Sequence, residues 1–360
     1  MPAAQADTGS PGRTRAEERA RDVSHRILAI TMGIALVSLV ILWRNSFPYE
    51  DAAMLFRYAE NVAAGHGVVW NPGGPHVDGA TDLGFMFLLA ALVKFGLSSE
   101  TAALVVNSVA FLTIAAILYE FGTRRSRSSG FGAVLAIAFM GSPAIAIMAG
   151  GFGAVTFAAC LVVAFLTIIA LMDEPTHRRA VVAGVACSLP GLIRPEGILI
   201  VAIFAAMALI DAVPLRRLVV VAVPTALTYG VLTVWRWAYF GYPLPNPYYK
   251  KGGGVLHVDG LMDAIRFVFA VGLLPLVAVC VTAFFLHGAD RRRWLAYVSG
   301  LAALLGMWIL VSSEMNHSYR FEFPTFAIAL VMLADLAPRA FGRSLERFDI
   351  RLTTRLGALA

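Results

Sequence analysis

Long apolar runs, separated by short polar turns, make up most of this chain. Ten of these runs are predicted to cross a bilayer, and several of them approach or exceed the ~18–20 residues that a spanning helix needs. They cover residues 27–43, 102–121, 131–147, 154–172, 180–193, 197–213, 218–240, 264–287, 295–312 and 323–337. The pattern therefore predicts an all-α polytopic membrane protein with a bundle of about ten transmembrane helices.

One further apolar run, Gly84–Leu97, decides the direction in which the later helices cross the membrane. It has about 14 residues, which is short for a span and typical of a helix that lies at the membrane interface. If this run does not cross, ten spans remain and both termini lie on the same side. If it does cross, every later loop changes side.

The distribution of charge supports the interfacial assignment. The chain is 59% hydrophobic and only 14% charged, whereas soluble domains carry roughly a quarter of charged residues. Most of its lysines and arginines fall in the leader 1–26, in short turns at 124–127, 178–179, 216–217 and 291–293, and in the tail 338–360. With ten spans all of these segments lie on one side, as the positive-inside rule requires of the cytoplasmic side.

The sequence therefore divides into three parts. Residues 1–26 form a basic cytoplasmic leader that we expect to be disordered, 27–337 form the transmembrane module, and 338–360 form a basic cytoplasmic tail. The net charge of +6 follows from this topology and does not indicate a nucleic-acid partner. The three cysteines, Cys160, Cys187 and Cys280, lie inside apolar runs and have the pattern of small buried hydrophobic residues.

The largest polar segment, residues 48–82, lies in the predicted first external loop, 44–99. It begins with the adjacent carboxylates Glu50 and Asp51, continues as a short helix pattern to about Ala64, and ends in a loop rich in Gly, Asn and Pro. The positive end of the helix dipole stabilises acidic residues in the first turn, and this effect alone would explain why Glu50 and Asp51 stand there. The helical period, however, aligns Glu50 with Arg57 and Asn61, which is more than capping requires.

The remaining polar residues of the predicted outer face lie in three further segments. Arg194 and Glu196 stand between two apolar runs, where ionisable groups are costly and indicate function or a mutual ion pair. The segment 241–251 supplies Asn246, Tyr248 and Lys250, and its aromatics would also suit interface anchors. Arg320 precedes the last span.

Cations and carboxylates on one membrane face suit an anionic lipid headgroup, whose phosphate would be held by Arg and Lys. The carboxylate pair could deprotonate an acceptor hydroxyl or hold a divalent cation. Glu50 and Asp51 are the only candidates for such a cation, and the histidines do not have the spacing of a zinc site.

Three ordered motifs resemble a known family. The run E-D-A-x3-F-R-Y-A-x-N-x3-G-H-G-x-V-x-N-P-G-G-x3-D-G at 50–79, then L-I-R-P-E-G at 192–197, then G-x-P-L-P-N-x-Y-Y-x-K at 241–251, resemble the polyprenyl-phosphate-dependent glycosyltransferases of the GT-C superfamily. The most similar branch is that of the actinobacterial arabinofuranosyltransferases. This resemblance implies a helical bundle whose first external loop carries interfacial helices and an acidic catalytic residue.

The resemblance also implies roles for individual residues. Asp51 matches the catalytic base, with Glu50 beside it. Binding of the donor phosphate is expected of Arg194, Lys250 and Arg320. Binding of sugar or acceptor is expected of Arg57, Tyr58, Asn61, Asn71, Asp78, Glu196, Asn246 and Tyr248.

The sequence departs from the family pattern at Gly151-Phe152-Gly153-Ala154, where relatives often carry Gly-x-Glu-Thr. The function expected from the sequence is transfer of a sugar, with arabinofuranose as the first candidate, from a polyprenyl-phosphate donor to an extracytoplasmic cell-envelope glycan. The alternatives are a mannosyltransferase of the same superfamily, a lipid-linked-sugar flippase or transporter, and an inactive relative that serves as an assembly partner.

Overall fold

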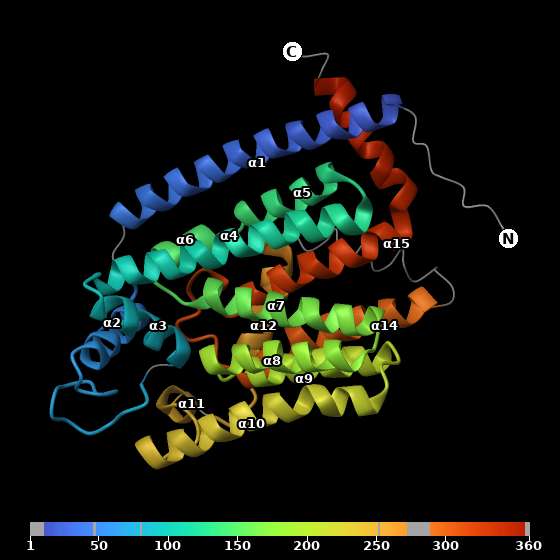
Figure 1. Cartoon of the computed structure of the whole chain (residues 1–360). Coiled ribbons are helices and arrows are strands. Elements are labelled where there is room, and N and C mark those ends of the chain that lie inside the picture. The colour runs from blue at the N-terminus through green and yellow to red at the C-terminus, as the bar shows by residue number, and fades with distance from the viewer. Residues whose placement is uncertain (1–10, 46–47, 80, 251–252, 272–288, 357–360) are drawn as a thin grey trace.

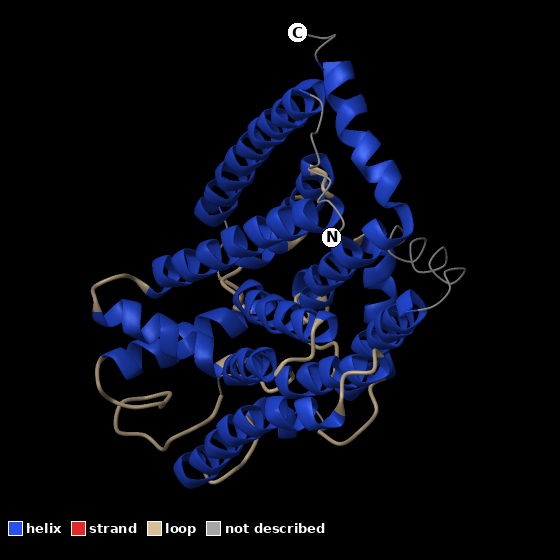
Figure 2. Cartoon of the chain, turned by 45° about the vertical axis from the view of Figure 1, so that its right-hand side comes forward, coloured by secondary structure: helices blue, strands red, loops and turns tan. Residues whose placement is uncertain are grey.

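The computed structural model describes residues 11–45, 48–79, 81–250, 253–271 and 289–356. Within these ranges every regular element is a helix, and the single β contact is an isolated bridge between Val69 and His76 (Figure 2). The hydrophobic pattern thus predicted the all-α class correctly.

The helices follow one another with short connections. Their order is α1 (Pro11–Asn45), α2 (Glu50–Ala63), α3 (Leu83–Lys94), α4 (Ser99–Ser126), α5 (Ser129–Met140), α6 (Ala144–Ala149), α7 (Ala154–Asp173), α8 (His177–Ile193), α9 (Gly197–Ile210), α10 (Leu215–Phe240), α11 (Asn246–Lys250), α12 (Val258–Ala270), α14 (Ala289–Gly306), the 3-10 turns η1 (Met307–Leu310) and η2 (His317–Tyr319), and α15 (Phe323–Leu356).

Six helical segments in the described ranges are long and apolar enough to cross a membrane, which makes the chain a multi-pass membrane protein. They are Arg21–Asn45, Ser99–Ser126, Ala154–Asp173, Leu215–Phe240, Asp290–Leu310 and His317–Gly342. Leu83–Lys94, Ser129–Met140 and Gly197–Ile210 are apolar but shorter. The total of ten spans stays a prediction, and most of the expected span 264–287 lies outside the described residues.

Two expectations about element boundaries need correction. The expected run 131–147 is divided into α5 and α6, because Gly141 and Pro143 interrupt the helix between them. Helix α1 begins at Pro11, so the second half of the leader is helical where we expected disorder. Its Ala, Arg and Glu residues have high helix propensity, and they continue directly into the apolar part of α1.

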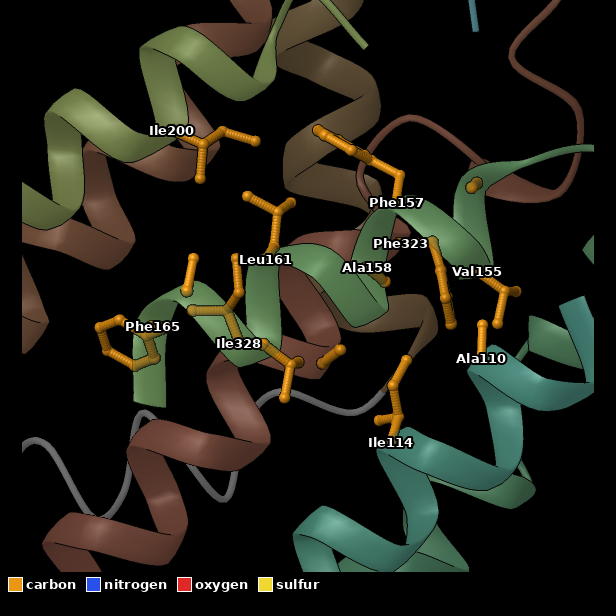
Figure 3. Close-up of a cluster of buried hydrophobic side chains, with 14 of the residues drawn as sticks. Ala110, Ile114, Val155, Phe157, Ala158, Leu161, Phe165, Ile200, Phe323 and Ile328 are labelled. Atoms are coloured by element: carbon orange, nitrogen blue, oxygen red, sulfur yellow. The ribbon is translucent and has the colours of Figure 1, made fainter. Parts of the chain in front are cut away.

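Helix α7 lies at the centre of the bundle. In the most apolar 18-residue stretch of α7, 72% of the residues are buried, whereas in that of α1 only 11% are buried. Figure 3 shows Leu161 and Phe165 of α7 among side chains of the surrounding helices, including Ile114 of α4, Ile200 of α9 and Ile328 of α15. Helix α1 lies along the outside, beside α5 (Figure 1), and most of its apolar side chains remain free to face lipid.

The two ends of the bundle carry different polar clusters. Helices α2 and α3 lie at the left end in Figure 1, whereas the start of α1 and the later part of α15 lie toward the upper right. Gly153 at the start of α7 adjoins Asp82, and Asp173 at its end joins an ion-pair network with Arg125, Arg293 and Arg339. A helix of this length spans roughly 30 Å, so the clusters lie about a bilayer apart.

The network at the right end joins five helices through buried ion pairs. Arg293 of α14 contacts Asp173 at 3.1 Å, Asp211 at 2.9 Å and Asp335 at 2.9 Å. Asp335 also accepts a hydrogen bond of 2.8 Å from the hydroxyl of Tyr297. Because these charges neutralise one another, the network fixes the helix ends without leaving a buried charge unpaired.

Candidate active site

The start of helix α2 is held against the segment that precedes α7. The backbone N–H of Tyr49 donates to the carbonyl of Gly150 at 3.2 Å. The Tyr49 ring stacks on His317 with a centroid distance of 4.5 Å and on Phe152 at 5.2 Å. These contacts place the first turn of α2, with Asp51, beside the turn that precedes α15.

Asp51 forms an ion pair with Arg320, which donates through its Nη2. The Arg320 side chain is buried, and its guanidinium carbon lies 3.8 Å from the centroid of the Phe152 ring. The Phe152 carbonyl in turn accepts a hydrogen bond of 3.0 Å from the buried Asn107 amide. Asp51 retains 34% exposure of its side chain, so one side of this pair is open to a ligand.

A second guanidinium lies in the same cluster. Arg194 follows α8 and contacts Asp82 at 2.9 Å through Nη1 and Glu196 at 3.0 Å through Nη2. It is placed there by close packing of α3 on α8: a Cβ at Gly84 would lie 2.5 Å from the carbonyl oxygen of Leu192. Arg194 and Arg320 both approach the Phe321 ring, at 5.6 Å and 5.0 Å.

The two carboxylates that hold Arg194 differ in their electrostatics. Burial raises the pKa of Asp82, and the nearby charges of Arg194 and Arg320 do not fully offset it. Burial acts in the same direction on Glu196, but the charge and hydrogen bond of Arg194 and a backbone hydrogen bond together hold the pKa of Glu196 below its usual range. Asp82 is therefore the more easily protonated of the two.

Three of the residues expected to bind sugar or acceptor join α2 to its own loop, and their role toward a substrate stays a prediction. Arg57 donates to the Trp70 carbonyl at 2.7 Å and to the Asn71 side chain at 2.8 Å. Asn61 donates to the carbonyls of Val69 and Trp70 at 2.7 Å and 3.1 Å. The aligned polar face of α2 thus shapes the first loop, and Arg57 also stacks on Trp70.

Tyr58, Asp78 and Asn246 lie together around a buried ion pair. The fully buried Asp78 carboxylate contacts Nε of Arg236 on α10 at 3.3 Å, and the Asp78 carbonyl accepts a 2.9 Å hydrogen bond from the Asn246 N–H. Burial raises the pKa of Asp78 to about 6, although the charge of Arg236 opposes the shift. Burial and the Asp78 charge raise the pKa of Tyr58. Glu196 also acts on Arg236 electrostatically, so this pair adjoins the Arg194 cluster.

Three expected site residues lie outside these clusters. The side chains of Glu50, Tyr248 and Lys250 are exposed. Tyr248 contacts Tyr249, and within the described ranges the carboxylates Asp51, Asp82 and Glu196 form their ion pairs with Arg320 and Arg194 and none with Lys250. The donor-phosphate assignment of Lys250 therefore has no geometric support here.

The two carboxylates expected to bind a divalent cation, Glu50 and Asp51, do not point toward a common site. Asp51 faces Arg320 while the adjacent Glu50 is exposed, because consecutive helical residues point about 100° apart. Among the residues with defined placement, no group of three or more His, Cys, Asp or Glu side chains could hold a metal ion. A divalent cation at Glu50 and Asp51 would need ligands from the substrate.

Several residues of the cluster were not predicted from the sequence. They are Tyr49, Asp82, Phe152, Arg236 and His317. Arg236 carried a usable signal, since a charge inside the apolar run 218–240 points to a buried partner. Asp82 and the aromatic residues had no such signal, because their roles depend on contacts between distant segments.

The Gly153 departure from the family pattern also has a structural counterpart. A Cβ at Gly153 would lie 2.7 Å from Cδ1 and Cγ of the Phe85 ring and 3.0 Å from Oδ2 of Asp82. The Phe85 ring and the Asp82 carboxylate thus together occupy the space beside this glycine.

Comparison of the chain with protein-family models, curated proteins and solved structures finds no match.

Proposed function

We propose that this chain is a membrane glycosyltransferase that transfers a sugar from a polyprenyl-phosphate donor to an extracytoplasmic cell-envelope glycan. The observation that carries the proposal is that Asp51 meets Arg320 beside Arg194, although these residues come from three distant segments. A carboxylate next to two guanidiniums provides a proton acceptor and a phosphate-binding group in one place. Arabinofuranose is the first candidate sugar, from the motif resemblance, and mannose is the second.

In the proposed reaction, an acceptor hydroxyl attacks the anomeric carbon of the donor sugar. Asp51 accepts the hydroxyl proton as the new bond to the sugar forms. The bond between the sugar and the phosphate oxygen breaks, and the polyprenyl phosphate leaves with increased negative charge. Arg194 and Arg320 stabilise that charge in a partly buried site where their effect is larger than in water.

An apolar groove near Arg194 suits the lipid part of the donor. Its volume is about 440 Å³, and it is lined by Leu192, Leu227, Thr228, Val231, Leu232 and Trp235. Leu192 lies two residues before Arg194, so the groove adjoins the segment that carries the guanidinium proposed to bind the phosphate.

The proposed topology has ten spans, cytoplasmic termini and an extracytoplasmic site. It is supported by the location of the site at the end of the bundle opposite the network of Arg125, Arg293 and Arg339. Basic residues on one side of a bundle are the usual mark of the cytoplasmic side.

One observation favours a lipid-linked-sugar flippase as a second candidate. Charged residues buried between helices can mark a transport path, and Asp335 and Arg293 are such residues. Their mutual ion pairs, however, suit a fixed clamp as well. Reconstituted vesicles separate the two functions, because a flippase moves the lipid-linked sugar across the bilayer without transferring it.

The decisive experiment supplies the purified, reconstituted chain with a radiolabelled polyprenyl-phosphate sugar and a glycan acceptor. We expect transfer by the native chain and a loss of at least ~100-fold in Asp51→Asn, the range of an absent general base. The matched control is Glu50→Gln, which neutralises the adjacent exposed carboxylate and should retain most of the activity. Equal activity of the Asp51 variant and the native chain removes the assignment of Asp51.

A further inference from the structure

Asp82 has an unusual position for a carboxylate that precedes a helix. It stands at the N-cap of α3, but its side chain accepts no capping hydrogen bond. Instead the carboxylate turns toward Arg194, with its other oxygen close to Gly153. Because Asp82 makes no capping hydrogen bond, the position of its carboxylate is determined by the ion pair with Arg194.

The charges of this cluster do not balance when every group is ionised. Asp51, Asp82 and Glu196 supply three negative charges, and Arg194 and Arg320 supply two positive charges. An oxyanion that enters this site would therefore meet an excess negative charge, which opposes binding in a poorly solvated environment. Nε of Arg320 is buried and, among the described residues, has no hydrogen-bond acceptor, so a donor remains for such a ligand.

We infer that Asp82 takes up a proton when an oxyanion, such as the phosphate of a lipid donor, binds between Arg194 and Arg320. The proton removes the excess charge and weakens the hold of Asp82 on Arg194, whose Nη1 can then donate to the ligand. The site thereby becomes a proton-linked anion site. This inference concerns the same site as the proposed function, but it depends on anion binding and not on sugar transfer.

Asp82 is the group in the cluster best suited to this role. The charged groups that face it are Arg194 and Glu196 from the corner between α8 and α9, Asp51 from α2 and Arg320 before α15. Glu196 receives two contacts from Arg194, at 3.0 Å and 3.4 Å, whereas Asp82 receives one. Burial already raises the pKa of Asp82, and a bound anion would raise it further because like charges disfavour ionisation.

The direction of the pH effect follows from linkage. If the bound state holds one more proton than the free state, affinity for the anion falls as pH rises, by up to about tenfold per pH unit. The effect is confined to the window between the pKa of Asp82 in the free site and its higher pKa in the occupied site.

The test measures binding of sulfate to the full-length chain in detergent or nanodiscs between about pH 5 and 8. Sulfate is a suitable oxyanion probe because it does not titrate in this range, unlike phosphate, whose second pKa is ~6–7. Calorimetry in two buffers of different ionisation enthalpy gives the number of protons taken up. A parallel titration with an isoprenyl phosphate compares a lipid headgroup with the free ion.

We expect sulfate affinity of the native chain to fall about tenfold per pH unit over part of this range. Asp82→Asn should bind sulfate at high pH as tightly as the native chain binds at low pH, with no proton uptake. Asp82→Glu, which keeps an ionisable group, should retain the slope. Native binding that is independent of pH, or a slope that persists in Asp82→Asn, overturns the inference, as does a native chain that binds no sulfate at low pH.

Matched variants separate Asp82 from its titratable neighbours. Glu196→Gln, Asp51→Asn, Asp78→Asn and His317→Gln each remove one other group at or near the cluster. Asp78→Asn and His317→Gln should retain the pH slope, because they leave the three carboxylates and two guanidiniums of the cluster in place. Glu196→Gln and Asp51→Asn remove the excess negative charge and should weaken the slope. If the slope disappears in any of these variants instead of in Asp82→Asn, that residue and not Asp82 carries the proton. A chain that shows the slope but transfers no sugar supports this inference and contradicts the proposed function.

Discussion

Asp51 and Arg320 are separated by 269 positions in the sequence and form an ion pair at one end of the bundle. Arg320 follows a turn in which Ser318 and Tyr319 have positive φ angles of 56° and 55°. Such conformations are costly for residues other than glycine, by about 1–3 kcal/mol each, and they persist where the surrounding structure enforces them. The strained turn therefore places Arg320 against Asp51, which is consistent with a functional role for the pair.

The first prediction distinguishes the two expected phosphate ligands, Arg320 and Lys250. Arg320→Lys keeps the charge but loses the planar group that stacks on Phe152, so we expect transfer activity to fall by about tenfold or more. Lys250→Ala should change activity less than about threefold, because Lys250 is exposed and, among the described residues, forms no ion pair with the carboxylates of the cluster. The measurement is kcat/KM with the lipid-linked donor, and a larger loss in the Lys250 variant contradicts this prediction.

The second prediction concerns the pH dependence of stability through Asp78. Its pKa is raised to about 6 from an ordinary value of 3.8, so between these values the folded chain binds more protons than the unfolded chain. The contribution of Asp78 to stability therefore falls as pH rises from about 4 to about 6 and stays constant above that. In thermal unfolding, the stability of the native chain relative to Asp78→Asn should therefore fall as pH rises from about 4 to about 6.

Asp259 provides a control for that experiment. It is an exposed carboxylate whose pKa is lowered by hydrogen bonds from the Ser313 backbone and side chain. Asp259→Asn should therefore leave the decline over pH 4–6 in place. A native chain whose stability relative to Asp78→Asn is constant or increases over this window contradicts the assignment.

The third prediction tests the ion-pair network at the opposite end of the bundle. Asp335→Asn removes a buried carboxylate that pairs with Arg293. The loss should lower the free energy of unfolding by about 3–5 kcal/mol. Glu120→Gln breaks the exposed pair with Arg124, four residues away on α4, and should cost about 0.3–0.5 kcal/mol. Unfolding of the detergent-solubilised chain measures both, and similar effects of the two substitutions would argue against a clamp.

The fourth prediction addresses topology. In a chain whose native cysteines are replaced, His66→Cys in the first loop should react with a membrane-impermeant thiol reagent added to intact cells. Arg216→Cys, which is also exposed but lies in a basic turn, should react only after the membrane is opened. Labelling of both positions from outside, or of neither, contradicts the ten-span arrangement with an extracytoplasmic site.

Some of the candidate site could be predicted from the sequence. Asp51, Arg194, Glu196 and Arg320 were expected on one face, and the structure brings them together with Asp82. Arg57, Asn61 and Asn71 were expected near the substrate, but hydrogen bonds join them into a support for the first loop. The side chains of Arg57 and Asn61 could be placed on one helix face by periodicity, whereas their hydrogen-bond partners depended on the path of the loop that carries Asn71.

The sequence by itself determined that this protein is all-α and crosses the membrane several times. Apolar runs of this length favour transfer from water into the bilayer, where a helix satisfies its own backbone hydrogen bonds. It also determined the helices after Pro48 and near Gly84, through polar and apolar patterns that act within a few residues. Only the tertiary structure decided that Asp51 pairs with Arg320, that Asp82 holds Arg194, and that Asp78 is buried against Arg236. Such contacts join segments up to hundreds of residues apart, and they follow from how the helices pack rather than from any local pattern.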